Sequence, residues 1–219
     1  MERRRVSVVF FQPRHMGKVL QFSHKQPQKF DFERVKKRRQ NGPAAKGQLS
    51  LFASQGAQVL RLPTDIGPFE EALLLDERGD ARTQEAYLRA ISEGDSVADA
   101  YCNLGILESK SGHVSRAFDC FTKSLEHDPR HFESHYNLGN LYFEEGNLRL
   151  ARMHYELAAE VDPGFSNLYF NLALVHALNS DYPGALSALS KHKELAPKEE
   201  GEKADELIEN LRRSLAGKD

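Results

Sequence analysis

Three asparagines are the residues whose type and spacing most clearly suggest a chemical role. Asn103, Asn137 and Asn171 recur at intervals of 34 residues. A carboxamide both donates and accepts hydrogen bonds, so each side chain can pair with the C=O and N–H of a peptide whatever that peptide's sequence. If folding brings them to one surface, the three asparagines predict a site for an extended chain.

A second candidate site is the pentapeptide formed by Gln48, Leu49, Ser50, Leu51 and Phe52. It resembles the segment by which bacterial replication and repair proteins bind the sliding clamp. In such a complex Leu51 and Phe52 are apolar anchors and Gln48 supplies an oriented amide. The alternative is a local hairpin, because residues 49–52 and 59–62 are both rich in strand-forming residues.

A third candidate site is a run of five cations within six residues, which are candidate phosphate contacts on nucleic acid: Arg34, Lys36, Lys37, Arg38 and Arg39. The alternative is a solvated basic tail that rests against the acidic remainder of the chain. Residues 1–62 carry 14 Lys/Arg against 3 Asp/Glu, whereas residues 63–219 carry 16 against 29. We therefore expect a basic, largely disordered arm over residues 1–62, with a short helix over residues 30–40, joined to an acidic body.

Motifs for catalysis are missing from the sequence. It contains no glycine-rich phosphate loop, no Gly-x-Ser-x-Gly elbow and no His-Glu-x-x-His motif. His127, His131 and His135 have a spacing that suits a metal on one helix, but Pro129 interrupts a helix between the first two. The sequence predicts no enzyme, cofactor, metal or small-molecule substrate.

The composition bears on the compartment. The chain has two cysteines and no apolar run long enough to span a bilayer, and its mean hydropathy is -0.58. These features predict a cytoplasmic protein without a membrane partner.

The elements that must position these residues follow from a repeat. Residues 98–199 contain three copies of a 34-residue pattern, closed by Pro129, Pro163 and Pro197. Each copy divides into two helical stretches, and small residues at Gly105, Gly139 and Ala173 allow the helices to approach closely. The pattern resembles the tetratricopeptide repeat family. The predicted fold is an all-α solenoid of helical hairpins, with a degenerate repeat over residues 63–97, three repeats over 98–199, and a capping helix and tail over 200–219.

The resemblance implies that the first helix of each repeat lines a concave groove with an asparagine ladder. The residues it suggests for partner-peptide binding are Asn103, Ile106, Tyr136, Asn137, Asn140, Phe143, Phe170, Asn171 and Leu174. The alternative is that the capping helix or the chain's own tail covers this groove. Relatives that bind chaperone tails carry Lys and Arg where this chain has Cys102, Asn167 and Asn171, which argues against such a receptor.

These observations predict a non-enzymatic scaffold that binds an extended segment of a partner protein. The alternative function is a nucleic-acid-associated adaptor that uses the basic arm on phosphates, without sequence specificity, and Gln48–Phe52 on a bacterial sliding clamp.

Overall fold

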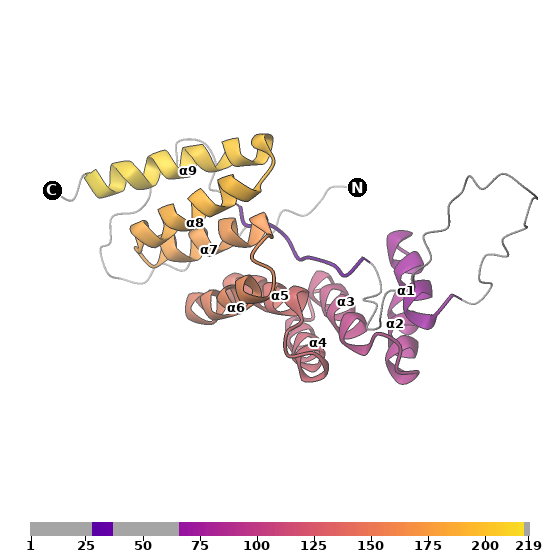
Figure 1. Cartoon of the computed structure of the whole chain (residues 1–219). Coiled ribbons are helices and arrows are strands. Elements are labelled where there is room, and N and C mark those ends of the chain that lie inside the picture. The colour runs from indigo at the N-terminus through magenta and orange to yellow at the C-terminus, as the bar shows by residue number, and fades with distance from the viewer. Residues whose placement is uncertain (1–27, 37–65, 217–219) are drawn as a thin grey trace, which may run out of the picture. The chain divides into compact units, whose positions relative to one another are not determined.

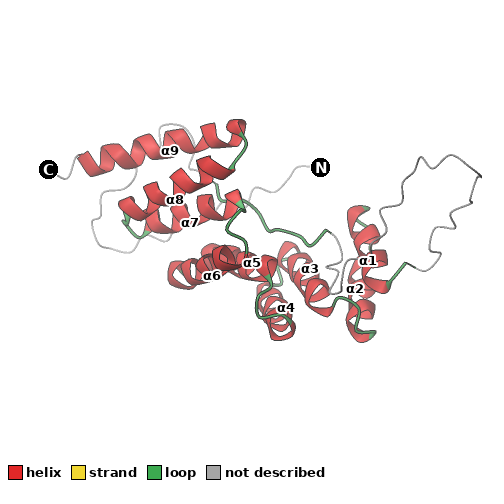
Figure 2. Ribbon diagram, viewed as in Figure 1, coloured by secondary structure: helices red, strands yellow, loops and turns green. Residues whose placement is uncertain are grey.

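The computed structural model describes residues 28–36 and 66–216. Residues 66–216 form helices joined by short turns, and no strand occurs within the described ranges (Figures 1 and 2). The helices are α1 (Pro68–Glu77), α2 (Thr83–Ser92), α3 (Val97–Lys110), α4 (Val114–His127), α5 (Phe132–Glu144), α6 (Leu148–Val161), α7 (Ser166–Leu178), α8 (Tyr182–Leu195) and α9 (Lys198–Ala216). The predicted all-α class is confirmed, including the degenerate first pair α1–α2.

The described residues belong to two compact units. One unit contains residues 34–36 and 66–129, with helices α1 to α4. The other contains residues 28–33 and 130–216, with helices α5 to α9. The boundary after Pro129 lies in the turn between α4 and α5, so each unit holds whole helical pairs.

The turns inside the three clear pairs share one backbone conformation. Gly112, Gly146 and Ser180 each follow the first helix of a pair and have φ angles of 80°, 74° and 60°. In each turn the next residue donates its N–H back into the helix, as Asp181 does to the carbonyl of His176 at 2.9 Å. This is the Schellman motif. It needs one residue in the left-handed conformation, which glycine adopts without steric cost.

Close helix packing explains the small residues within the pairs. A methyl group at Gly105 would lie 2.7 Å from the ring of Phe121, and one at Gly139 would lie 2.5 Å from the ring of Tyr155. The aromatic ring of the second helix therefore fills the space that a Cβ atom would need. The third pair has Ala173 in place of glycine, and Leu189 then stands where the other pairs have an aromatic residue.

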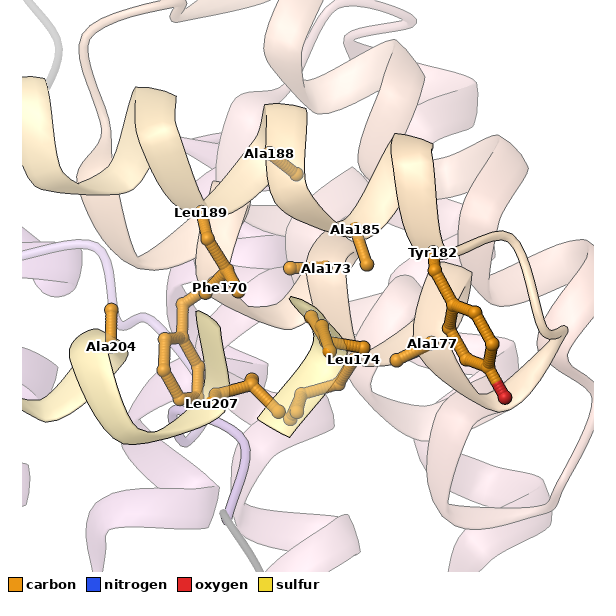
Figure 3. Close-up of a cluster of buried hydrophobic side chains, with 11 residues drawn as sticks. Phe170, Ala173, Leu174, Ala177, Tyr182, Ala185, Ala188, Leu189, Ala204 and Leu207 are labelled. Carbon is orange, nitrogen blue, oxygen red and sulfur yellow. The ribbon is translucent and has the colours of Figure 1, made fainter. Parts of the chain in front are cut away.

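Helix α9 closes the apolar end of its unit, as the sequence predicts for a capping helix. Ala204, Leu207 and Leu211 are buried in one cluster with side chains from α7 and α8. Figure 3 shows Phe170 of α7 beside Leu207 of α9 within this cluster. The helix begins at Lys198, directly after Pro197. Acidic residues occupy its first turn, where their negative charges interact favourably with the helix dipole.

Candidate functional site

Residues 28–36, here called the N-terminal segment, precede the helices in the sequence and have an extended conformation (indigo in Figure 1). The sequence-based prediction of a helix over residues 30–40 is wrong for residues 30–36, and residues 37–40 lie outside the described ranges. The physical reason is that backbone groups of this segment pair with distant side chains instead of with one another.

In the unit that contains α5 and α7, two asparagines hold the segment by reciprocal hydrogen bonds. The N–H of Phe30 donates to Oδ1 of Asn171 at 2.7 Å, and Nδ2 of Asn171 donates to the carbonyl of Phe30 at 3.1 Å. Asn137 makes the same pair with Glu33, at 2.8 Å in both directions. Each carboxamide therefore takes the place of a neighbouring β-strand for one residue of the segment.

The unit that contains α3 repeats this geometry. The N–H of Val35 donates to Oδ1 of Asn103 at 3.0 Å, and Nδ2 of Asn103 donates to the carbonyl of Val35 at 3.0 Å. Val35 is 3% exposed and Asn103 is fully buried. All three members of the asparagine ladder (Asn103, Asn137 and Asn171) thus pair with an extended backbone, and that backbone is the chain's own.

Two tyrosines and a second asparagine fix Asn171 from behind. Its Nδ2 lies 3.0 Å from the hydroxyl of Tyr136 and 2.9 Å from Oδ1 of Asn140. The hydroxyl of Tyr155 donates to the same oxygen of Asn140 at 2.6 Å. Burial raises the pKa of both tyrosines well above the usual value, so both hydroxyls stay protonated. The network fixes the orientation in which the carboxamide of Asn171 meets the backbone of Phe30.

Asn103 has a comparable support, which ends on a carboxylate. Its Nδ2 lies 3.1 Å from the hydroxyl of Tyr87, and that hydroxyl donates to Oδ2 of Asp76 at 2.9 Å. Asp76 also pairs with the guanidinium of Arg34 at 2.9 Å. Its side chain is only 5% exposed, so the positive charge of Arg34 offsets the cost of a buried carboxylate.

The side chains of Lys29 and Phe30 also contact the helices. The ring of Phe30 meets the ring of Phe170 edge to face, with centroids 5.2 Å apart, and lies 5.9 Å from the imidazole of His192. Phe30 thereby packs against the apolar cluster that α9 closes. Lys29 forms an ion pair with Glu144 at 2.9 Å.

The structure divides the nine predicted partner-binding residues by their contacts. The three ladder asparagines and Phe170 contact the N-terminal segment. Tyr136 and Asn140 support Asn171 from behind, whereas Leu174 lies in the apolar cluster with α8 and α9. Phe143 is partly buried against the packed cores and Ile106 is 1% exposed. Within the described residues most of these side chains are buried, and the ladder holds a segment of the chain itself. This arrangement is the alternative that the sequence left open.

Sequence reasoning missed the occupant of the ladder. The sequence left open that the chain's own tail covers the groove, but it did not predict which residues do so: Lys29 pairs with Glu144, Arg34 pairs with Asp76, and Phe30 packs on Phe170. The sequence did contain a signal for burial of this segment. The large apolar residues Phe30, Phe32 and Val35 alternate with its charges, whereas a fully solvated tail is usually poor in such residues.

The other candidate sites stand as follows. Arg34 is paired with Asp76, and Lys36 lies at the end of the segment, whereas Lys37, Arg38, Arg39, Gln48, Leu49, Leu51 and Phe52 lie outside the described residues. Clamp binding and phosphate binding by that region therefore stay predictions. Within the described ranges no group of three potential ligands is placed to hold a metal ion, and no helix is long and apolar enough to cross a membrane.

Comparisons with known proteins agree with the helical-repeat fold. Two family models, both described as tetratricopeptide repeat, match residues 120–153 and 141–200. Tetratricopeptide repeat protein 8 of Mus musculus is 28% identical over 132 residues, which are 60% of this chain and 25% of that protein. The chain therefore spans about a quarter of the length of that relative.

Two solved structures share the fold. The first tetratricopeptide repeat domain of Spaghetti (RPAP3), bound to an HSP90 peptide of sequence SRMEEVD, superposes with a TM-score of 0.51 at 21% identity and covers 54% of this chain and 93% of that one. A double mutant of MamA (RS-1 ArsTM) gives a TM-score of 0.53 at 18% identity over 69% of this chain and 94% of that one.

Proposed function

We propose that this chain, which tetratricopeptide repeat models match at residues 120–153 and 141–200, is a non-enzymatic scaffold that binds an extended segment of a partner protein through its asparagine ladder. The observation that carries this proposal is the reciprocal pairing of each ladder carboxamide with one residue of an extended backbone. Members of the family generally mediate protein–protein interactions, and the proposal assigns that role to these three side chains.

The chemistry of the ladder suits a protein ligand. Each carboxamide pairs with backbone atoms that every residue except proline offers, so the ladder selects an extended conformation rather than a sequence. The carboxamide of Asn171 is held by Tyr136 and Asn140, and that of Asn103 by Tyr87, so these two side chains lose little rotamer entropy when a peptide binds. Sequence preference must then come from contacts made by the ligand's side chains.

The HSP90 peptide in the RPAP3 complex supports peptide binding by this fold and also indicates a contrast. That peptide is acidic, with two glutamates and a terminal aspartate in its sequence. The segment held by the ladder here pairs Lys29 with Glu144 and Arg34 with Asp76, so the acidic groups belong to the helices. We therefore propose a partner segment that is cationic rather than acidic.

The proposal can be tested by affinity capture with the full-length chain and a matched pair of variants. Asn137→Leu keeps the number of side-chain heavy atoms and the branch at Cγ but removes both hydrogen bonds to the bound backbone. Asn179→Leu places the same change at an exposed position at the end of α7 and serves as the control. We expect the wild-type and Asn179→Leu chains to capture partners that Asn137→Leu does not capture. Chemical cross-linking of the wild-type complex should then join partner peptides to α5 and α7. Equal recovery by all three chains would show that the ladder does not bind the partner.

A further inference from the structure

We propose that the N-terminal segment is an internal competitor for the partner, and that the partner presents an extended segment of the same chemistry. That segment carries a cation followed by an aromatic residue and, four residues after the aromatic residue, an arginine followed by a small aliphatic residue. The inference rests on the proposed function, because it names the ligand that the ladder would accept. Lys29, Phe30, Arg34 and Val35 are the internal copy of this sequence.

The aromatic position is defined by the contacts of Phe30. Its ring packs edge to face on Phe170 and tilts against the fully buried ring of His192. Nδ1 of His192 lies 3.0 Å from the carbonyl of Ser166, which holds the imidazole in place. A surface of two fixed rings favours a third aromatic ring, because edge-to-face pairs are more favourable than their buried area alone predicts. Small or charged side chains would leave this surface uncovered.

The cationic positions are defined by two carboxylates of the helices. Glu144 pairs with Lys29 near the surface, and Asp76 pairs with Arg34 where its carboxylate is nearly buried. Asp76 already accepts a hydrogen bond from Tyr87, but its negative charge still needs a counterion. A segment that displaces residues 28–36 must therefore bring a cation to Asp76, or it leaves a buried charge unpaired.

The aliphatic position is defined by Val35. Its side chain is buried, and its backbone makes both hydrogen bonds to Asn103. A β-branched residue favours the extended backbone that this pairing requires. Valine thus serves both the extended conformation and the burial of the side chain.

Competition follows from the two pairings sharing the same atoms. Oδ1 and Nδ2 of each ladder asparagine bond to one residue of the N-terminal segment, so a partner backbone can pair there only after that residue leaves. The internal segment is covalently attached and therefore has a high effective concentration at the ladder. A free peptide of equal intrinsic affinity binds weakly until the internal segment is weakened.

The test uses the full-length chain with Phe30→Ala and Val35→Ala, which removes the two apolar anchors and leaves every ladder residue intact. The probe is a fluorescein-labelled peptide of residues 26–38, followed by fluorescence anisotropy. We expect the double variant to bind this peptide at least tenfold more tightly than the wild-type chain does. Circular dichroism of both chains checks that the helices are retained, and Glu33→Pro, which removes one N–H donated to Asn137, provides a second opened chain.

Two control peptides separate the proposal from the function on which it rests. A peptide with Phe30→Ala and one with Arg34→Glu should each bind the opened chains at least tenfold less tightly than the parent. Equal binding of all three peptides would overturn the side-chain preference and leave backbone binding by the ladder standing. Failure of the parent peptide to bind either helical opened chain would overturn the competition, while partner capture that depends on Asn137 would still support the scaffold function. A wild-type chain that sediments as a dimer, dissociated by the peptide, would show that the segment comes from a second copy and would overturn the internal assignment.

Discussion

Replacing Asn137 by leucine should release the N-terminal segment while leaving the helices folded. Leucine branches at the same atom as asparagine and adds no heavy atom, but the side chain no longer pairs with the backbone of Glu33. Asn171 also contacts the network of Tyr136 and Asn140, so its replacement would disturb the helices as well.

The expected magnitude follows from the two hydrogen bonds, both 2.8 Å long. A protein hydrogen bond contributes about 0.5–1.5 kcal/mol net, so the free energy that holds the segment should fall by about 1–3 kcal/mol. Because 1.4 kcal/mol corresponds to a factor of ten, the segment should detach about 5- to 150-fold more often.

Amide hydrogen exchange measures this detachment directly. In Asn137→Leu, exchange of peptides that cover residues 28–36 should accelerate by that factor, whereas exchange in α6 should change much less. Asn179→Leu is the control for the leucine substitution itself and should leave residues 28–36 as protected as in the wild type. Unchanged exchange at residues 28–36 in Asn137→Leu would refute the reasoning, because the carboxamide would then not be holding the segment.

Three further predictions concern the helices themselves. Gly139→Ala should lower the free energy of unfolding by about 1–3 kcal/mol in urea titration, because its methyl group would lie 2.5 Å from the ring of Tyr155; a loss below 0.5 kcal/mol would contradict the packing argument. Ser180→Gly should raise the unfolding free energy by about 0.5–1 kcal/mol, because it relieves a left-handed serine at φ 60°; a decrease in the midpoint would contradict this. Burial and the neighbouring imidazole of His135 lower the pKa of His154 from 6.5 to about 4, so the unfolded chain binds more protons in this range and stability should fall by about 1–2 kcal/mol as the pH drops from 6.5 to 4. His154→Gln should flatten this pH dependence, and an unchanged slope would contradict the assignment.

The helical pairs could be predicted from the sequence because their signals are local and repeated. Pro129, Pro163 and Pro197 mark the ends of successive copies, and Gly112 and Gly146 mark the turns inside them. Each of these residues acts within a few positions of itself, through a missing N–H or a left-handed backbone. The same spacing in three copies makes accidental agreement improbable, so the fold class follows from periodicity.

The position of the N-terminal segment could not be predicted in this way. Its backbone pairs with side chains that are 68 to 141 residues away in the sequence. Local composition describes residues 28–36 as part of a basic tail, and nothing local indicates that the three asparagines bind this tail rather than another chain. The sequence could indicate the chemistry of the ladder, but the identity of the occupant depends on contacts between distant parts of the chain.

The burial of the predicted groove residues also exceeds what the sequence indicates. Tyr136 and Leu174 occupy positions that the family resemblance assigns to a binding surface, yet both are buried among neighbouring helices. The one-face pattern of a helix does not distinguish a side chain that meets a ligand from one that meets the next helix. Tyr136 packs against neighbouring helices, and its hydroxyl also supports Asn171, which contacts the bound segment.

The central claim is that the ladder carboxamides pair with the backbone of residues 30, 33 and 35. Nuclear Overhauser contacts from the side-chain amide protons of Asn103, Asn137 and Asn171, in the uniformly labelled full-length chain, test this claim most directly. The pairing predicts contacts from Asn171 to Phe30, from Asn137 to Glu33 and from Asn103 to Val35. Side-chain amide protons that exchange rapidly with water and show no contact to these three residues would contradict it.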